Sequence, residues 1–254
     1  MKKLTVSFMC LLVACTTVLA EGEDKIEFGL TSDFYSKYVW RGQLLNDDPV
    51  FQPGISASYK GFTFSLWGNL NLTDYGTSDN SGEFTEYDLT LDYSGNLTEK
   101  VGYSVGVIHY HFPSASATDT TEFYWGFSFD VPLNPTITVY HGLGNENGMY
   151  ANFGISHTIE NILKISDNVT ANLELGASIG WGNSTYNKDY WGIDDSRLND
   201  LVLSVGIPFD LGNGWAVRPS FNYAILVDGK IRSADTYATN SDYFFTGVSI
   251  SKSF

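Results

Sequence analysis

The sequence predicts an all-β protein, a single transmembrane antiparallel up-and-down β-barrel of about 12 strands. Three observations favour this fold. Apolar and polar residues alternate with period two along most of the chain, which is the spacing of the two faces of a strand. The alternating segments are about nine to fourteen residues long, which suits strands tilted across a bilayer better than the ~5–6-residue strands of soluble sheets. Short and long connections also alternate, as in outer-membrane barrels.

The composition argues against several other classes of protein. The net charge of −15 opposes binding to nucleic acid, because phosphate contacts need basic patches. The hydrophobic fraction of 43% is too high for full-length disorder. No apolar run reaches the ~18 residues that a membrane-spanning helix needs. An aromatic content of 15% fits a protein rich in strands.

The first 20 residues are expected to be a cleaved signal peptide, so that residues 21–254 form the barrel. Lys2 and Lys3 supply its basic start, residues 4–13 its apolar core and residues 18–20 its small-residue cleavage site. An alternative remains open, because residues 12–15 resemble a lipobox that would make Cys15 the lipidated first residue. With the first cut the mature chain keeps no cysteine and therefore no disulfide.

Each expected strand has one apolar face and one polar or small face. In the first, Ile26, Phe28 and Leu30 share the lipid side, and the alternation continues through Tyr38 and Trp40. We therefore expect one long strand as far as Arg41. The residues that alternate within the twelve expected strands are 26–41, 51–59, 62–72, 86–93, 101–107, 122–130, 137–139, 149–156, 169–181, 201–207, 217–225 and 244–254.

The connections predict which barrel end faces which compartment. Short turns are expected at 60–61, 94–100, 132–135, 159–168 and 210–214, and longer polar loops at 42–50, 74–83, 113–120, 183–199 and 228–241. Two connections fit less well, because 144–148 is short and 159–168 is long. Short turns belong to the periplasmic side and longer loops to the outer side. No segment shows a helical stripe of ten residues or more.

Aromatic residues cluster near the ends of the expected strands. Amphipathic rings favour the boundary between water and lipid, so two girdles are expected. The outer girdle would contain Tyr38, Trp40, Phe51 and Trp181, and the inner one Tyr59, Phe62, Tyr93, Phe209, Trp215 and Phe254.

The C-terminal residues resemble the recognition signal of outer-membrane β-barrels. The chain stops at Phe254 on an alternating segment, with Ile250 and Val248 on the same face. The resemblance implies that the barrel assembly machinery is a partner. Lys252 departs from the pattern, since an apolar residue is usual there, and it is expected to snorkel to the interface.

Further residues resemble the TorF-type porins, a family of bacterial outer-membrane proteins. The resemblance is carried by residues 31–33, 38–42, 51–55, 61–68, 87–89, 110–113 and 122–126. It implies a barrel in the outer membrane, in contact with the lipid bilayer and lipopolysaccharide, and a role in transport. It implies no substrate and no site residue. Residues 34–37 form an insertion relative to the shorter family pattern.

Charged residues on the inward faces predict the electrostatics of the lumen. The acids are Glu27, Asp33, Glu86, Asp88, Asp92, Glu122, Asp130 and Glu174, and the bases are Lys37, Arg41 and Arg218. Eight carboxylates against three cations favour cations over anions. We therefore expect a small diffusion channel that prefers cations and passes small hydrophilic solutes, without a cofactor.

Two alternatives remain open at this stage. One is a structural or adhesion barrel plugged by its own side chains: inward Trp67, Tyr124 and Tyr150 favour constriction, whereas many inward Gly and Ser residues favour an open interior. The other is an outer-membrane lipid hydrolase. The stretch Gly176–Gly180 has the form Gly-x-Ser-x-Gly, but it lies inside an alternating strand segment and not at a strand-to-helix turn. His157 follows Ser156, but neighbours in a strand point to opposite faces, so we expect no enzyme. His109 and His111 share a face, but two ligands are too few for a zinc site.

Overall fold

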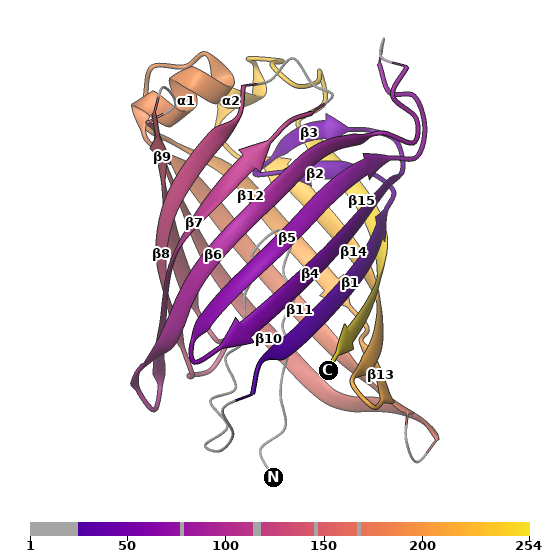
Figure 1. Ribbon diagram of the computed structural model, residues 1–254. Coiled ribbons are helices and arrows are strands. Elements are labelled where there is room, and N and C mark those ends of the chain that lie inside the picture. The colour runs from indigo at the N-terminus through magenta and orange to yellow at the C-terminus, as the bar shows by residue number, and fades with distance from the viewer. Residues whose placement is uncertain (1–24, 77–78, 114–117, 145–146, 167–168) are drawn as a thin grey trace.

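The computed structural model describes residues 25–76, 79–113, 118–144, 147–166 and 169–254. Twelve long antiparallel strands form a closed barrel (Figure 1), which confirms the predicted fold class. The twelve are β1 (Glu27–Tyr35), β4 (Val50–Tyr59), β5 (Phe62–Asn71), β6 (Phe84–Thr98), β7 (Val101–His111), β8 (Thr120–Phe129), β9 (Thr136–Leu143), β10 (Met149–Ser166), β11 (Val169–Gly182), β12 (Arg197–Gly206), β14 (Trp215–Leu226) and β15 (Asp242–Ser253). The expected signal peptide and Cys15 lie outside the described residues.

Every wall strand pairs with its neighbours in chain order, and β1 closes the barrel against β15. One additional short strand, β13 (Phe209–Gly212), pairs with β11 and β14. The barrel end that carries the tight connections is called the turn end below, and the opposite one the loop end. In Figure 1 the loop end is at the top.

The first strand is shorter than the alternation predicted. β1 stops at Tyr35, and the chain then leaves the wall to form β2 (Tyr38–Trp40) and β3 (Gln43–Asn46). These two strands pair only with each other and lie within the barrel near its loop end (Figure 1). The prediction that the wall strand continues to Arg41 was therefore wrong. We call residues 38–46 the lumen hairpin.

Two short helices lie at the loop end, α1 (Ser184–Trp191) and α2 (Gly229–Arg232) (Figure 1). Neither is long and apolar enough to cross a membrane. Both fall within connections that were expected to be long and polar. An N-cap at Asn183 and a left-handed Gly192 with φ of +70° mark the ends of α1; such caps are readable in a sequence.

Tight turns follow from residues that accept positive φ. Lys60 and Gly61, with φ of +49° and +86°, join β4 to β5, and Asn213 and Gly214 do the same before β14. This is the two-residue hairpin geometry whose twist matches that of the strands. Two predicted turns were too wide, because β6 continues to Thr98 and β10 to Ser166. Each of these strands extends beyond its expected end.

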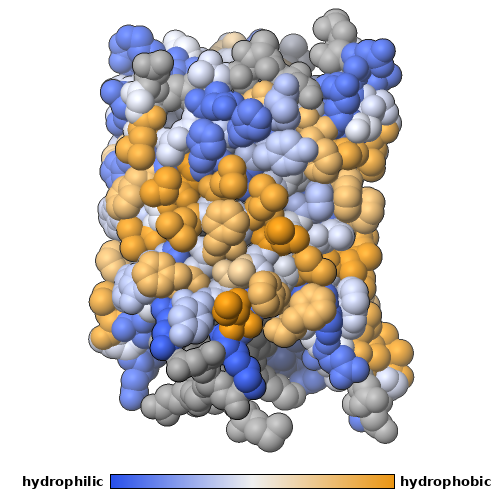
Figure 2. Space-filling view, in the orientation of Figure 1, coloured by the Kyte–Doolittle hydropathy of each residue, from blue (hydrophilic) through white to orange (hydrophobic). Residues whose placement is uncertain are grey.

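The outer wall is apolar and the interior is polar, the reverse of a soluble protein. A broad apolar band crosses the visible face of the barrel (Figure 2). Exposed large apolar side chains occur on strands all around the wall and include Phe28, Phe64, Leu91, Phe153, Leu203 and Phe244. Buried groups include Thr63, Ser65, Asn69, Thr90, Ser178, Ser204, Ser220 and Asn222. A closed sheet leaves no unpaired backbone edge facing lipid, so this surface is the lipid-facing wall of a transmembrane barrel.

The turn-end aromatic girdle matches the exposure of its side chains. Tyr59, Phe62, Tyr93, Trp215 and Phe254 are all exposed. At the loop end the prediction fails for Tyr38, which is buried in the lumen hairpin, and for Trp40, which lies beside it. The alternation is the same in a wall strand and in a hairpin folded inward, so it could not separate the two positions.

The depth of a lipid-facing position should decide how well it tolerates charge. Leu91 lies at the middle of β6, and Leu97 lies on the same face one residue before the end of that strand; they are 56% and 61% exposed. We expect Leu91→Arg to cost about 2–4 kcal/mol of unfolding free energy and Leu97→Arg about 0–1 kcal/mol. Urea unfolding in liposomes measures both. Equal losses would contradict the assigned membrane position.

Candidate functional site

The tip of the lumen hairpin is a two-residue turn of Arg41 and Gly42, with φ of +48° and +78°. A Cβ on Gly42 would lie 2.7 Å from Leu226 and 2.8 Å from Asp200. Glycine is therefore required both by the backbone conformation and by the close approach to the wall. The turn directs the Arg41 side chain into the barrel interior, where its partners lie on the opposite wall.

Arg41 makes a bidentate ion pair with Glu122 of β8. Its Nη1 and Nη2 lie 2.8 and 2.7 Å from the two carboxylate oxygens, and the Tyr110 hydroxyl donates to the same carboxylate at 2.8 Å. Both charged side chains are buried. Planar fork-to-fork pairing of this kind combines strength with fixed geometry, so the pair holds the hairpin tip against the far wall.

Aromatic rings enclose the same guanidinium group. Its central carbon lies 4.4 Å from the Trp40 ring centroid, 4.3 Å from that of Tyr140 and 4.4 Å from that of Tyr150. Tyr186 of α1 packs on Tyr150 with 5.2 Å between ring centroids. Cation–π attraction is stronger in such a desolvated setting. Arg41 therefore joins the hairpin, three wall strands and α1 in one cluster.

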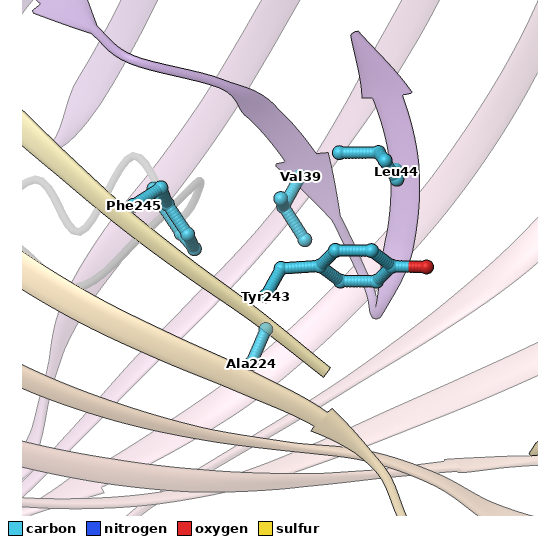
Figure 3. Packing of buried hydrophobic residues seen from close by; sticks show 5 residues of the cluster. All are labelled: Val39, Leu44, Ala224, Tyr243 and Phe245. Carbon is cyan, nitrogen blue, oxygen red and sulfur yellow. The ribbon is translucent and has the colours of Figure 1, made fainter. Parts of the chain in front are cut away.

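A small apolar core fixes the other side of the lumen hairpin. Val39 and Leu44 point toward Ala224, Tyr243 and Phe245 of β14 and β15 (Figure 3). All five side chains are buried. This cluster explains why apolar residues of the hairpin face the barrel wall rather than lipid.

Polar contacts complete the anchoring of the hairpin. The Tyr38 hydroxyl donates to Glu86 at 2.9 Å, and Asn46 Nδ2 donates to Asn71 at 2.8 Å. Gln43 Nε2 donates to the Tyr186 hydroxyl of α1 at 3.3 Å. The lumen hairpin is thus bonded to the β5 and β6 wall and to α1.

At the loop end α1 and α2 pack together over the mouth. Trp191 of α1 is buried with Ile231 of α2 and Leu226 of β14. Asp228 caps α2 and receives a hydrogen bond from Arg197 at 2.8 Å. Although burial opposes the change, the Arg197 bond and the α2 backbone amides lower the pKa of Asp228 below its usual value. Asp228 therefore stays ionised at neutral pH and keeps its ion pair with Arg197.

The structure places the predicted lumen charges in three groups. Glu86, Asp88, Asp92, Glu122 and Glu174 are buried in the interior, and Asp33 is half-buried. Three bases have acidic partners: Arg41 pairs with Glu122, Arg218 with Glu174 at 2.7 Å, and Lys37 with Asp47. Glu27 and Asp130 are exposed.

Glu27 and Asp130 were also predicted to line the interior, and for these two exposed residues that position stays a prediction. Glu27 is the first residue of β1, and Asp130 follows the end of β8. Both lie at strand ends, where the side chains are open to solvent. A further acid was missed: Asp200 of β12 is only 2% exposed and accepts a hydrogen bond from the Tyr150 hydroxyl at 2.9 Å. It directly precedes the apolar Leu201, so alternation could have placed it inside.

An excess of negative charge remains after the ion pairs are counted. Asp33, Glu86, Asp88, Asp92 and Asp200 form no ion pair with any basic side chain in the described part of the chain. Their hydrogen-bond partners include neutral groups, such as Tyr124, whose hydroxyl lies 2.5 Å from Asp92. Buried carboxylates of this kind attract cations and repel anions.

Three histidines make contacts outside this acidic interior. His109 contacts Thr121 at 3.0 Å, His111 pairs with the exposed Asp119 at 2.8 Å, and His141 accepts from Trp125 at 3.1 Å. His157 is exposed. Within the described ranges no three His, Cys, Asp or Glu side chains gather as metal ligands. The histidines therefore do not join the acids of the lumen.

Comparison of the sequence with protein families gives a match over residues 20–210. The matching family is described as a bacterial protein of unknown function, Gcw_chp. The chain belongs to the Gcw_chp family. Comparison of this Gcw_chp chain with curated proteins gives no match.

Solved structures of outer-membrane barrels resemble the Gcw_chp chain. The NanC porin has 9% sequence identity and a TM-score of 0.52, over 89% of this chain and 98% of that one. The KdgM porin has 10% identity and a TM-score of 0.51, over 89% and 99%. LpxR from Salmonella typhimurium has 10% identity and a TM-score of 0.52, over 88% and 99%. At such low identity these likenesses show the fold, that of an outer-membrane β-barrel.

Proposed function

We propose that this Gcw_chp protein is a small outer-membrane diffusion channel that prefers cations and passes small hydrophilic solutes. The observation that carries the proposal is the set of five acids without a basic partner among the described residues, Asp33, Glu86, Asp88, Asp92 and Asp200. Fixed carboxylates in a narrow, partly desolvated passage are screened little by bulk salt. The resemblance to TorF-type porins supports the same role.

The lumen hairpin limits the size of the solutes in this proposal. Arg41 bridges the interior to Glu122, and Tyr186 of α1 packs above it. Twelve strands lie between the eight that side chains can fill and the sixteen of wide aqueous porins. A hairpin inside such a barrel leaves a passage for ions and small polar molecules rather than for long chains.

The acids of the lumen also argue against one class of solute. A KdgM porin structure contains disordered oligogalacturonate, which is a polyanion. In this Gcw_chp protein the two arginines of the interior, Arg41 and Arg218, are each paired with a glutamate. The unpaired charges are negative, so we propose that acidic oligosaccharides are excluded.

A second candidate function is a plugged structural or adhesion barrel. The observation that favours it is the filling of the loop-end half by the lumen hairpin and α1, with Gln43, Tyr186 and Asn187 all buried. Single-channel recording in planar bilayers separates the two candidates. Discrete cation-preferring conductance steps support the channel, whereas a folded protein without conductance supports the plugged barrel.

Assembly in the outer membrane is proposed to depend on the C-terminal residues. The Phe254 backbone N–H donates to Phe28 at 3.0 Å, beside the β1–β15 seam that closes the barrel. The ring is exposed and is therefore free for the assembly machinery. We propose that Phe254, Ile250 and Val248 form the assembly signal.

Removal of Phe254 should lower outer-membrane levels about tenfold while export across the inner membrane continues. The reason is that the signal would be lost and the seam weakened by one hydrogen bond, which is worth only ~1 kcal/mol. Quantitative blotting of membrane fractions measures the result. Phe62→Ala is the matched control, because Phe62 is another exposed aromatic of the same girdle. Normal levels without Phe254 would refute the assigned signal.

A further inference from the structure

Glu86 and Asp88 are two residues apart on β6 and both face the lumen, where each is only 6% exposed. Their carboxyl groups lie within hydrogen-bonding reach of each other. Two carboxylates brought together in a buried place repel each other, and burial strengthens the repulsion. A shared proton or a bound cation would relieve this repulsion.

Few groups of the protein offset the negative charge of Glu86 and Asp88. Glu86 receives the Tyr38 hydroxyl at 2.9 Å, whereas Asp88 Oδ1 is buried and accepts no hydrogen bond. A buried acceptor without a partner is uncommon in folded proteins and calls for an explanation such as a bound ion.

The other buried acids of the lumen differ from this pair. Glu122 and Glu174 each have an arginine, while Asp92 and Asp200 each have one tyrosine hydroxyl. Asp92 Oδ1 is also buried without a hydrogen bond, but Asp92 is not hydrogen-bonded to a second carboxyl group. Glu86 and Asp88 alone combine two adjacent carboxylates with no base, within the part of the barrel that the structure describes.

We propose that Glu86 and Asp88 bind one hard divalent metal cation of the Ca²⁺ type. Carboxylate oxygens are the ligands that such cations prefer, and two of them balance the charge of the ion. No third acidic or histidine side chain joins them in the described residues, so the Tyr38 hydroxyl and water complete the shell. With so few charged ligands the dissociation constant should be about 10⁻⁴–10⁻³ M.

The proposed cation site would link the lumen hairpin to the acidic residues of β6. Tyr38 belongs to the hairpin, and its ring lies 5.9 Å from that of Trp67, the residue paired with Asp88 across β5 and β6. A bound cation would draw the Tyr38 oxygen toward β6 and stabilise the hairpin against the wall. If the proposed channel function holds, the ion would also neutralise two of the five unpaired acids and weaken the preference for K⁺.

Terbium luminescence tests this site directly, because Tb³⁺ replaces Ca²⁺ at oxygen sites and is excited by nearby aromatic rings. The full-length protein, folded in detergent, is excited through Trp67 and Tyr38, and Ca²⁺ is then added as competitor. We expect one class of Tb³⁺ emission that Ca²⁺ displaces. Asp88→Asn and Glu86→Gln should each weaken it by about tenfold or more, as expected when one charged ligand of few is lost.

Asp200→Asn is the matched control, since Asp200 is a buried lumen acid hydrogen-bonded to a tyrosine but without an acidic neighbour. The Tb³⁺ emission from the Asp200→Asn variant should equal that from the parent protein. Asp88→Glu keeps the charge and should retain binding if Asp88→Asn fails to fold. No Ca²⁺-displaceable emission from the folded parent, or parental affinity in both Asp88→Asn and Glu86→Gln, overturns the proposal. Terbium emission does not depend on conductance. A protein that conducts but gives no displaceable emission contradicts the metal site alone, and a protein that gives the emission but does not conduct contradicts the channel function alone.

Discussion

Arg41→Ala should lower the free energy of unfolding by about 3–5 kcal/mol, because it leaves Glu122 as a buried charge without its partner. The loss also removes the contacts of the guanidinium with three aromatic rings at 4.3–4.4 Å. Urea unfolding in liposomes measures the change. In planar bilayers the same variant should conduct more than the parent, since nothing then holds the hairpin tip to β8.

Two further variants isolate the ion pair. Arg41→Ala combined with Glu122→Gln removes both charges and should recover part of the lost stability. Arg232→Ala removes an exposed arginine whose side chain donates to Ser241 at 3.2 Å, and it should change stability by less than about 0.5 kcal/mol. An Arg41→Ala loss no larger than the Arg232→Ala loss would show that the hairpin is not anchored through this pair.

Neutralising two lumen acids should reduce the preference for K⁺ over Cl⁻. Asp88→Asn with Asp92→Asn removes two of the five acids without a basic partner, and the reversal potential under a KCl gradient should move toward zero by roughly a third to a half. The side chains removed are buried, so salt in the bath screens them little.

The matched control for that double variant is Glu27→Gln with Asp130→Asn. It removes the same charge from residues that are exposed at strand ends, where salt screens them more strongly. Its reversal potential should stay close to that of the parent. Equal shifts in the two double variants would mean that total charge, and not the acids of the interior, sets the selectivity.

Period-two alternation was enough to predict the barrel wall. In β6 it separates the exposed Leu89 and Leu91 from the buried Asp88 and Asp92, because one side of each strand faces lipid and the other the lumen. Strand length then distinguished a membrane barrel from a soluble sheet. Both signals are local, so one sequence suffices to read them.

The lumen hairpin could not be predicted in the same way. Residues from Tyr38 to Trp40 are also extended, so their alternation looks like a continuation of β1. Their position depends on distant partners, above all Glu122 for Arg41 and Phe245 for the Val39 and Leu44 core. The local signal was the Arg41–Gly42 turn, since Gly is the residue that most readily takes positive φ.

The interior charge balance was predicted only in outline for a related reason. Alternation gives the face of a residue but not its partner, so the ion pairs of Arg41 and Arg218 were not visible. Depth along the barrel was also hidden, so the exposure of Glu27 and Asp130 at strand ends was not predicted. The lumen nevertheless contains buried acidic residues, as predicted, and these include Asp200 and the acids of β6.

The reversal potential of the unmodified protein in a planar bilayer under a KCl gradient tests the central claim most directly. An acidic lumen constricted by the hairpin predicts small discrete conductance steps and a reversal potential of the sign that K⁺ preference gives. A potential of the opposite sign, showing Cl⁻ preference, would contradict the account.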